Sequence, residues 1–112
     1  VALAERRQAA ALFEQIYGPR HPHVGLARCA AGLDLRELGR HDEALIEVER
    51  GAASIAATRP ADDCDLLFCT AIRGSLLHAL GRDVEAVAAL EPALARAATS
   101  ACVKEQRGEL EL

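Results

Sequence analysis

The sequence has few β-branched and aromatic residues, and it has no long apolar run. It has no tryptophan and no methionine, and aromatic residues make up only 3% of its 112 residues. Its one lysine is Lys104, its formal net charge is −4, and acidic and basic residues alternate along the chain. Nucleic-acid binding needs a clustered cationic surface, and a membrane span needs ~20 consecutive apolar residues. Neither pattern is present, so we expect neither kind of partner.

Cysteine is present, but the sequence gives no reason to expect disulfide bonds. The four cysteines are Cys29, Cys64, Cys69 and Cys102. No secretory signal is visible, and disulfides are rare where glutathione keeps thiols reduced. We therefore expect reduced, buried thiols and a cytoplasmic location.

What the sequence does contain is an internal repeat with a period of 42 residues. The segment Leu38-Gly39-Arg40-His41-Asp42-Glu43-Ala44 recurs as Leu80-Gly81-Arg82-Asp83-Val84-Glu85-Ala86, with five of seven positions identical. Gly32 and Gly74 precede the two segments at equal spacing. A fixed period of this length is typical of architectures in which each unit buries its apolar face against the next. The paired glycines predict that the following helix approaches closely, opposite Ala44 and Ala86.

Helix-forming residues dominate the composition, and glycine and proline divide the chain into segments. We expect helices over residues 2–17, 23–38, 42–57, 64–80 and 84–98, and a short closing helix over 100–109. Asp42 and Asp83 are expected to cap the third and fifth of these helices. Pro92 should kink the fifth helix or split it at Glu91, because proline removes a backbone hydrogen bond. The inward side of that helix is expected to carry Val87, Leu90, Leu94 and Ala97.

These residues resemble the tetratricopeptide repeat, in which two antiparallel helices form each unit. Gly32, Gly39 and Ala44 match that pattern in one unit, and Gly74, Gly81 and Ala86 match it in the next. The long period, together with Tyr17-Gly18-Pro19-Arg20-His21-Pro22-His23-Val24 and Gly39-Arg40-His41-Asp42-Glu43-Ala44, is similar to the kinesin-light-chain-like variety of the family. The resemblance implies an all-α fold, a right-handed α-solenoid of five or six helices. Residues 1–112 would form one domain: the second helix of a truncated unit (1–17), two full units (23–57 and 64–98) and the closing helix.

For function, the resemblance implies a non-catalytic protein-interaction module that needs no cofactor or metal. Proteins with this repeat variety and composition are often larger bacterial regulators, so we expect a piece of a signalling protein. In the family, the first helix of each unit lines a concave groove. The corresponding groove residues are Leu26, Cys29, Leu33, Arg36, Phe68, Ala71, Ser75 and His78.

The groove residues also suggest what kind of partner would fit. The Lys and Asn that grip a peptide backbone or carboxylate in the family are absent, and Cys29-Ala30 and Ala71-Ile72 stand at the usual Asn positions. An apolar groove suits an amphipathic helix or a second copy of the chain. Arg36 and His78 occupy matching positions and are the expected polar contacts.

Two chemical alternatives stay open at this stage. A zinc site could combine His21 and His23 with Cys64 and Asp65, since zinc takes Cys and His ligands. Thiol redox sensing could use Cys29 and Cys69, which lie close in register on neighbouring helices and would need exposure and a basic neighbour. A third alternative is a non-catalytic homo-oligomer. It would form through the apolar ends of the fragment, which are Val1 to Phe13 and the Pro92–Cys102 region.

Overall fold

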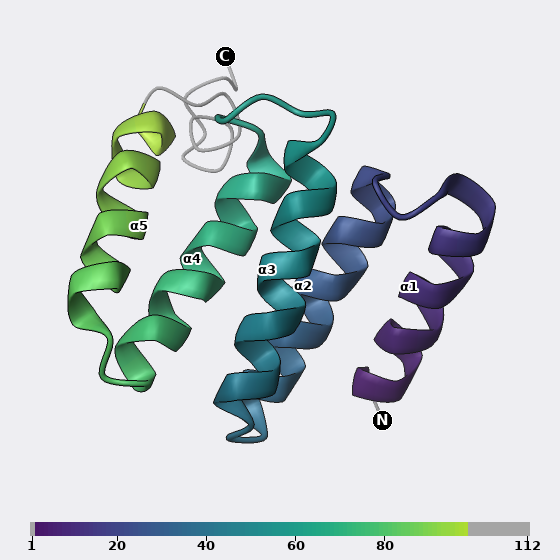
Figure 1. The fold of residues 1–112 in the computed structure, drawn as a ribbon, viewed down its shortest axis with the longest axis horizontal. Coiled ribbons are helices and arrows are strands. Elements are labelled where there is room, and N and C mark those ends of the chain that lie inside the picture. The colour runs from purple at the N-terminus through teal and green to yellow at the C-terminus, as the bar shows by residue number, and fades with distance from the viewer. Residues whose placement is uncertain (1, 99–112) are drawn as a thin grey trace, which may run out of the picture.

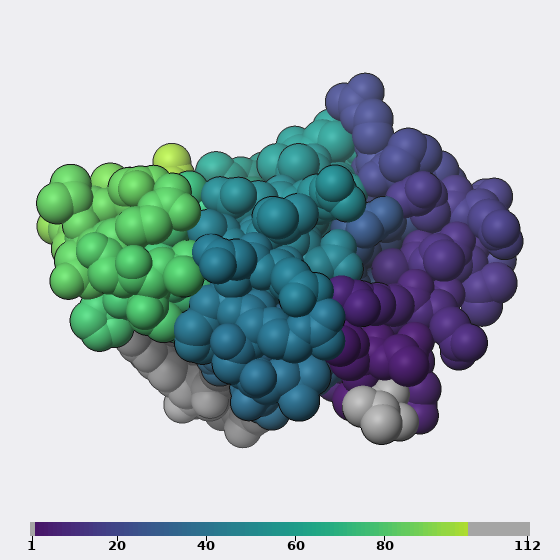
Figure 2. Space-filling view, turned by 60° about the horizontal axis from the view of Figure 1, so that its bottom comes forward, coloured from purple at the N-terminus to yellow at the C-terminus, as the bar shows by residue number. Residues whose placement is uncertain are grey.

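The computed structural model describes residues 2–98, and that part of the chain is all-α. It contains five helices and no strand: α1 (Ala2–Tyr17), α2 (Pro22–Glu37), α3 (His41–Ala56), α4 (Cys64–Ala79) and α5 (Asp83–Ala97). Each helix packs against its neighbours in the sequence, and α1 and α5 lie at opposite ends of the molecule with α3 between them (Figures 1 and 2). Every helix begins and ends within a residue or two of its expected position. The expected helix over 100–109 lies outside the described residues.

The two repeated turns have the same backbone geometry. Gly39 and Gly81 adopt positive φ angles of 78° and 75°, which residues with a side chain rarely adopt. The amide that follows each glycine donates to a carbonyl five residues back, from Arg40 to Leu35 and from Arg82 to Leu77, at 2.9 and 2.8 Å. This is the Schellman ending of a helix. It turns the chain back within three residues, so that α2 packs antiparallel to α3 and α4 to α5.

The expected capping by Asp42 and Asp83 is wrong. The residues that precede α3 and α5 are Arg40 and Arg82, and neither helix has a side-chain cap. Instead each arginine binds the carboxylate three residues ahead through two nitrogens, Arg40 to Glu43 and Arg82 to Glu85, at 2.6–2.9 Å. The aspartates lie inside the first turn, where a negative charge still favours the helix.

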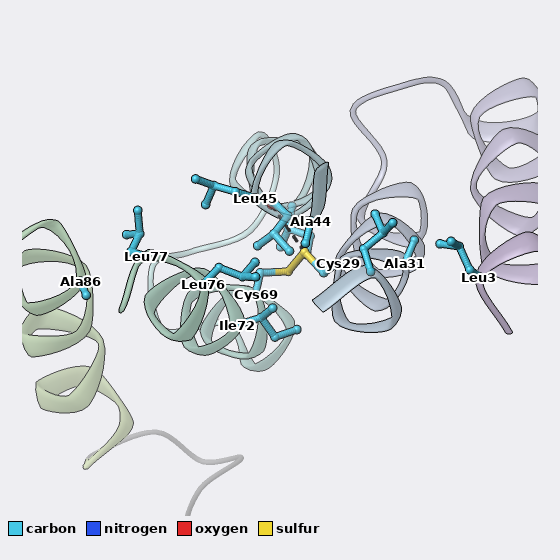
Figure 3. Packing of buried hydrophobic residues seen from close by; sticks show 13 residues of the cluster. Leu3, Cys29, Ala31, Ala44, Leu45, Cys69, Ile72, Leu76, Leu77 and Ala86 are labelled. Carbon is cyan, nitrogen blue, oxygen red and sulfur yellow. Dashed lines mark hydrogen bonds between the residues drawn. A yellow bond between two sulfur atoms is a disulfide. The ribbon is translucent and has the colours of Figure 1, made fainter. Parts of the chain in front are cut away.

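The core lies among α2, α3 and α4, where Leu35, Val48, Ile55, Leu76 and Leu77 are fully buried (Figure 3). These three helices lie inside the stack, and each packs against a helix on either side of it. The helices at the two ends contribute less, because each has a packing partner on one side only. Among the described residues, α1 buries Leu3 and Ala10, and α5 buries Ala86.

A disulfide crosses this core, and Cys64 is also disulfide-bonded, so the expectation of reduced thiols is wrong for all three described cysteines. Cys29 of α2 and Cys69 of α4 are bonded, with their Cα atoms 5.6 Å apart and both residues fully buried (Figure 3). They are 40 residues apart, so the bond links the first helix of one repeat unit to the first helix of the next. Their nearness in register was visible in the sequence, but the covalent bond was not expected.

Glycines set the spacing within each helix pair. A Cβ added to Gly32 would collide with the Val48 side chain and lie 3.2 Å from the Ala44 carbonyl oxygen, which confirms the expected close approach. In the second unit the residue opposite Gly74 is Leu90, one turn beyond Ala86. Val48 and Leu90 are 42 residues apart, so the two contacts are equivalent.

A second glycine pair exists only in the first unit. A Cβ added to Gly51 would lie 2.6 Å from the Gly25 carbonyl oxygen and 2.7 Å from Cys29 Sγ. The equivalent positions in the second unit are Leu67 and Ala93. Accordingly α2 and α3 share a more extensive contact than α4 and α5 do.

Helix α5 differs from expectation in two ways. It runs through Pro92 without interruption, so a split at Glu91 is wrong. Both Pro92 and Ala88, whose carbonyl loses its helical partner, are exposed, so water can satisfy that carbonyl. Two of the residues expected to face inward, Val87 and Leu94, are 52% and 68% exposed. They lie on a side of α5 that no described helix covers.

Candidate partner-binding site

The expected groove residues do not all line one surface. Leu33 is half-buried and packs against the core, and Phe68 is 39% exposed on α4. Cys29 is fully buried in the disulfide, so it cannot touch a partner. Leu26 and Ala71 border different hollows, one against α1 and the other against α5.

The polar pair expected in the groove has found other partners. Arg36 donates to the Ser75 hydroxyl at 2.7 Å, and this hydrogen bond joins α2 to α4. His78 lies 2.6 Å from Asp83 at the start of α5, and both side chains are mostly exposed. Arg36 and Ser75 therefore hold two repeat units together, and His78 belongs to the α4–α5 turn.

An apolar hollow lies between α1 and α2, and we call it the apolar pocket. It has a volume of about 340 Å³. Phe13 and His23 border it at one end and Arg6 borders it from α1. The full lining is Arg6, Ala9, Phe13, His23, Leu26, Ala27 and Ala30. Three alanines in this wall leave room for a bulky side chain from a partner.

Four rings gather beside the apolar pocket, and they were missed in the sequence. The Tyr17 ring stacks on His21 with centroids 4.3 Å apart, and His23 lies 4.7 Å from His21 and 5.7 Å from Phe13. The spacing of Phe13, Tyr17 and His21 at every fourth position was a signal for one helical face. The signal was not recognised because Gly18 and Pro19 end the helix before His21. Helical spacing does not predict which side chains meet once the chain has passed into a loop.

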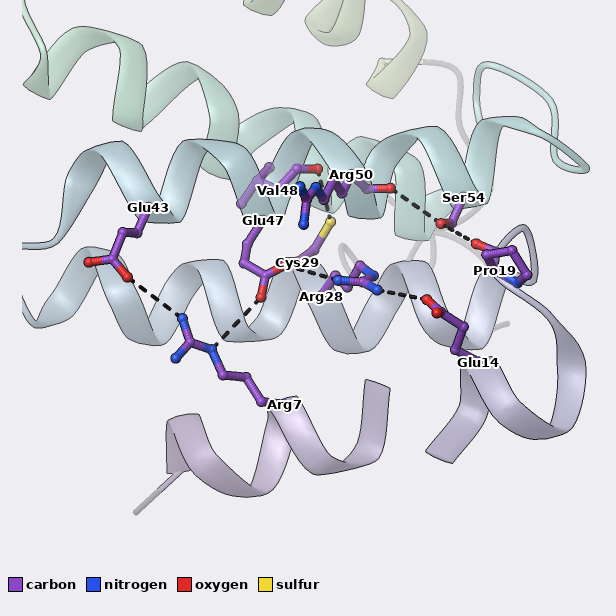
Figure 4. Close-up of polar contacts among 10 residues, drawn as sticks. All are labelled: Arg7, Glu14, Pro19, Arg28, Cys29, Glu43, Glu47, Val48, Arg50 and Ser54. Atoms are coloured by element: carbon purple, nitrogen blue, oxygen red, sulfur yellow. Dashed lines mark hydrogen bonds and ion pairs between the residues drawn. The ribbon is translucent and has the colours of Figure 1, made fainter. Parts of the chain in front are cut away.

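Ion pairs hold α1 on the rest of the molecule (Figure 4). Arg28 of α2 donates to Glu14 of α1 at 2.7 Å and to Glu47 of α3 at 3.1 Å. Burial disfavours the charged form of Arg28, but the hydrogen bonds to the two carboxylates outweigh this and raise its pKa. Arg6 pairs with Asp34 of α2 at 2.7 Å. These ion pairs fix the position of α1 relative to α2, so the apolar pocket lies between two helices that are held in place.

The structure gives little support to the two chemical alternatives. Among residues 2–98, no three side chains of His, Cys, Asp or Glu come together as a metal-ligand set. The Nδ1 atom of His21 accepts the His23 amide at 3.1 Å, so it caps α2. A sensor thiol must be reachable, and Cys29 and Cys69 are both inaccessible.

Comparison with known proteins identifies no relative. No protein-family model matches the chain, and neither curated proteins nor solved structures yield a match. Within residues 2–98, no helix combines the length and the apolar character needed to cross a bilayer.

Proposed function

We propose that the chain is a tetratricopeptide-like, non-catalytic interaction module, a scaffold fragment of a larger bacterial signalling protein. The observation that carries this proposal is the apolar pocket, an open hollow lined almost entirely by apolar atoms between two helices. Hollows of this kind between helices are common binding places for apolar side chains. The equivalent turns and paired arginine–glutamate contacts of the two units support a stacked repeat, and hence the solenoid.

The partner that fits best is an amphipathic helix. Ala9, Ala27 and Ala30 keep the walls of the apolar pocket low, so a helix can lie along α1 and α2 and insert one large apolar side chain. This binding needs no chemistry from the chain beyond shape and apolar surface.

A pair of alanine substitutions tests the proposal. Ala30→Glu places a charge in the apolar pocket, whereas Ala53→Glu places the same charge on an exposed position of α3. The probe is a 16-residue amphipathic helix of Leu, Ala and Glu. Its binding is measured from changes in the amide chemical shifts of the chain. We expect shifts centred on Leu26 and Ala30 that are lost in Ala30→Glu and kept in Ala53→Glu. Shifts that survive Ala30→Glu, or no saturable shifts at all, would overturn the proposal.

Self-association is the second candidate function, and the exposed side of α5 favours it. Val84, Val87 and Leu94 are 86%, 52% and 68% exposed there. Sedimentation velocity over a concentration series, with and without reductant, tests for a dimer. Leu94→Glu should abolish a dimer formed through α5, and Ile16→Glu, on equally exposed α1, should not. A monomer at all concentrations would contradict this candidate.

The expected cytoplasmic location is part of the proposal, and the Cys29–Cys69 disulfide weighs against it. Cytosolic glutathione keeps most thiols reduced. Alkylation of freshly lysed cells, followed by mass spectrometry of peptides containing Cys29 and Cys69, decides the matter. An oxidised pair would contradict a reducing compartment.

A further inference from the structure

We infer that the partner segment carries an oxyanion beside its apolar side chain, because a second, cationic pocket adjoins the apolar pocket. The inference rests on the proposed binding function and adds to it the chemical class of the partner. We call the second hollow the cationic pocket. It has a volume of about 490 Å³ and is lined by Tyr17, Arg20, His21, Pro22, Thr58 and Arg59.

Two loops that are distant in sequence build the cationic pocket. One joins α1 to α2 and the other joins α3 to α4. The Ser54 hydroxyl donates to the Pro19 carbonyl at 2.7 Å, and Ser54 is 8% exposed. This partly buried hydrogen bond fastens the first loop to the end of α3, where the second loop begins. It places Arg20 opposite Thr58 and Arg59.

The side chains around the cationic pocket offer mainly donors. Arg20 and Arg59 bring guanidinium groups, and Tyr17 and Thr58 bring hydroxyls. His21 already accepts the His23 amide at Nδ1, so its neutral form carries the ring proton on Nε2 and donates there. A wall rich in donors and poor in acceptors selects an anionic group.

The charges nearby leave one arginine available. Arg59 binds Asp63 at 3.2 Å, and Asp63 also accepts the amides of Asp65 and Leu66 at the start of α4. Arg20 has no carboxylate partner within residues 2–98. A ligand oxyanion would therefore pair with Arg20 and compete with Asp63 for Arg59.

The ring cluster is the wall shared by the two pockets. Phe13 and His23 line the apolar pocket, and Tyr17 and His21 line the cationic pocket. Tyr17 and His23 lie 5.5 Å apart, in edge-to-face geometry, across this wall. A ligand that passes over four rings can fill both pockets only if its apolar group and its oxyanion are close in sequence.

A carboxylate and a phosphoryl group share this chemistry, so the test includes both. The probes are the capped peptides Leu-Glu-Glu, Leu-phosphoserine and Leu-Gln-Gln. Their binding is measured from changes in the amide chemical shifts of residues 9–30 and 58–59. We expect both anionic peptides to bind at least about fivefold more tightly than Leu-Gln-Gln, as for a partly exposed ion pair, with the advantage reduced by salt. Binding by only one anionic peptide identifies the source of the oxyanion.

Three variants assign the effect to the cationic pocket. Arg20→Gln should remove the advantage of the anionic peptides, and Arg50→Gln, an exposed arginine on α3 outside this pocket, should leave it unchanged. Asp63→Asn keeps the cap on α4, since asparagine caps as well as aspartate does. It frees Arg59, so it should tighten binding of the anionic peptides.

The outcomes separate this inference from the proposed function. Equal binding of all three peptides, lost in Ala30→Glu, would overturn the inference and leave the apolar pocket as the binding site. An anionic advantage that Arg20→Gln does not change would also overturn it. Absence of binding by these peptides and by the amphipathic helix would overturn both.

Discussion

At the scale of single residues, Gly51 and Gly74 are both pressed against a neighbouring helix, but by different atoms. Gly51 faces the Gly25 carbonyl and the Cys29 backbone and sulfur, none of which can move alone. Gly74 faces the Leu90 side chain, which is only half-buried and can rotate. Adding the same methyl group should therefore lower the free energy of unfolding by different amounts at the two sites.

Gly51→Ala should lower the free energy of unfolding by about 1–3 kcal/mol, the usual cost of overpacking a core. Gly74→Ala should change it by less than about 1 kcal/mol, because alanine's higher helix propensity offsets the movement of Leu90. Urea unfolding of the two variants and the parent chain measures both values. A larger loss for Gly74→Ala than for Gly51→Ala would contradict this account of the packing.

The arginine–glutamate pairs at the two repeated turns predict a pH effect. The hydrogen bond from Arg40 lowers the pKa of Glu43, with help from the charges of Arg40 and Arg7, and Arg82 lowers the pKa of Glu85. A carboxylate with a lowered pKa in the folded state stabilises the protein above its unfolded pKa. That contribution is lost as pH falls through the folded value.

Carbon-detected NMR titration of the two glutamates checks this prediction. Both should titrate below the ordinary range for glutamate. Arg40→Gln should move the pKa of Glu43 back up and leave that of Glu85 unchanged, so the second turn is an internal control. Unchanged titration of Glu43 in the variant would show that the ion pair does not persist in solution.

At the scale of helices, the sequence was informative about where each one lies and less so about how it ends. Gly39 and Gly81 marked the turns, because a left-handed residue after a helix is a local requirement that glycine satisfies. Which residue begins α3, Asp42 or Arg40, does not follow from local sequence alone. Arg40 can bind Glu43 only once the turn has formed, and the Asp83 carboxylate is used by His78.

The disulfide is the feature of element packing that most affects stability. It closes a loop of about 40 residues, for which the chain-entropy estimate is about 4 kcal/mol. We expect Cys29→Ala/Cys69→Ala to lose about that amount in urea unfolding. Strong reductant also opens the disulfide of Cys64, so the parent chain refolded in reductant should lose at least this amount. Equal stability of the oxidised and reduced chains would contradict a cross-linking role.

At the scale of the whole molecule, stability should be unevenly distributed between the two repeat units. Helix α3 buries six residues, including Val48 and Ile55, whereas α5 buries only Ala86. Regions with little buried apolar contact open first. In hydrogen exchange, α5 amides should therefore exchange well before those of α3. Equal protection of both helices would indicate a single cooperative unit.

The candidate site was only partly predictable for a related reason. Leu26 and Arg36 lie on α2, as expected, but Leu26 borders the apolar pocket against α1 and Arg36 donates to Ser75 of α4, so they do not line one groove. The ring cluster and the cationic pocket depend on two loops meeting, and a partly buried hydrogen bond from Ser54 to Pro19 holds these loops together. A contact between residues 35 positions apart leaves no periodic trace in a sequence.

The position of the Cys29–Cys69 bond also has a mechanical consequence. A force applied to the two ends of the chain is carried through the sulfur atoms, so α3 and both flanking turns bear no load. Cys64 is also disulfide-bonded, so the comparison uses Cys64→Ala. Stretched to full length, this variant should be shorter when oxidised than when reduced by about 14 nm, at ~3.5 Å for each of the 40 residues bypassed. One unit of the repeat would then stay slack while the rest of the chain extends.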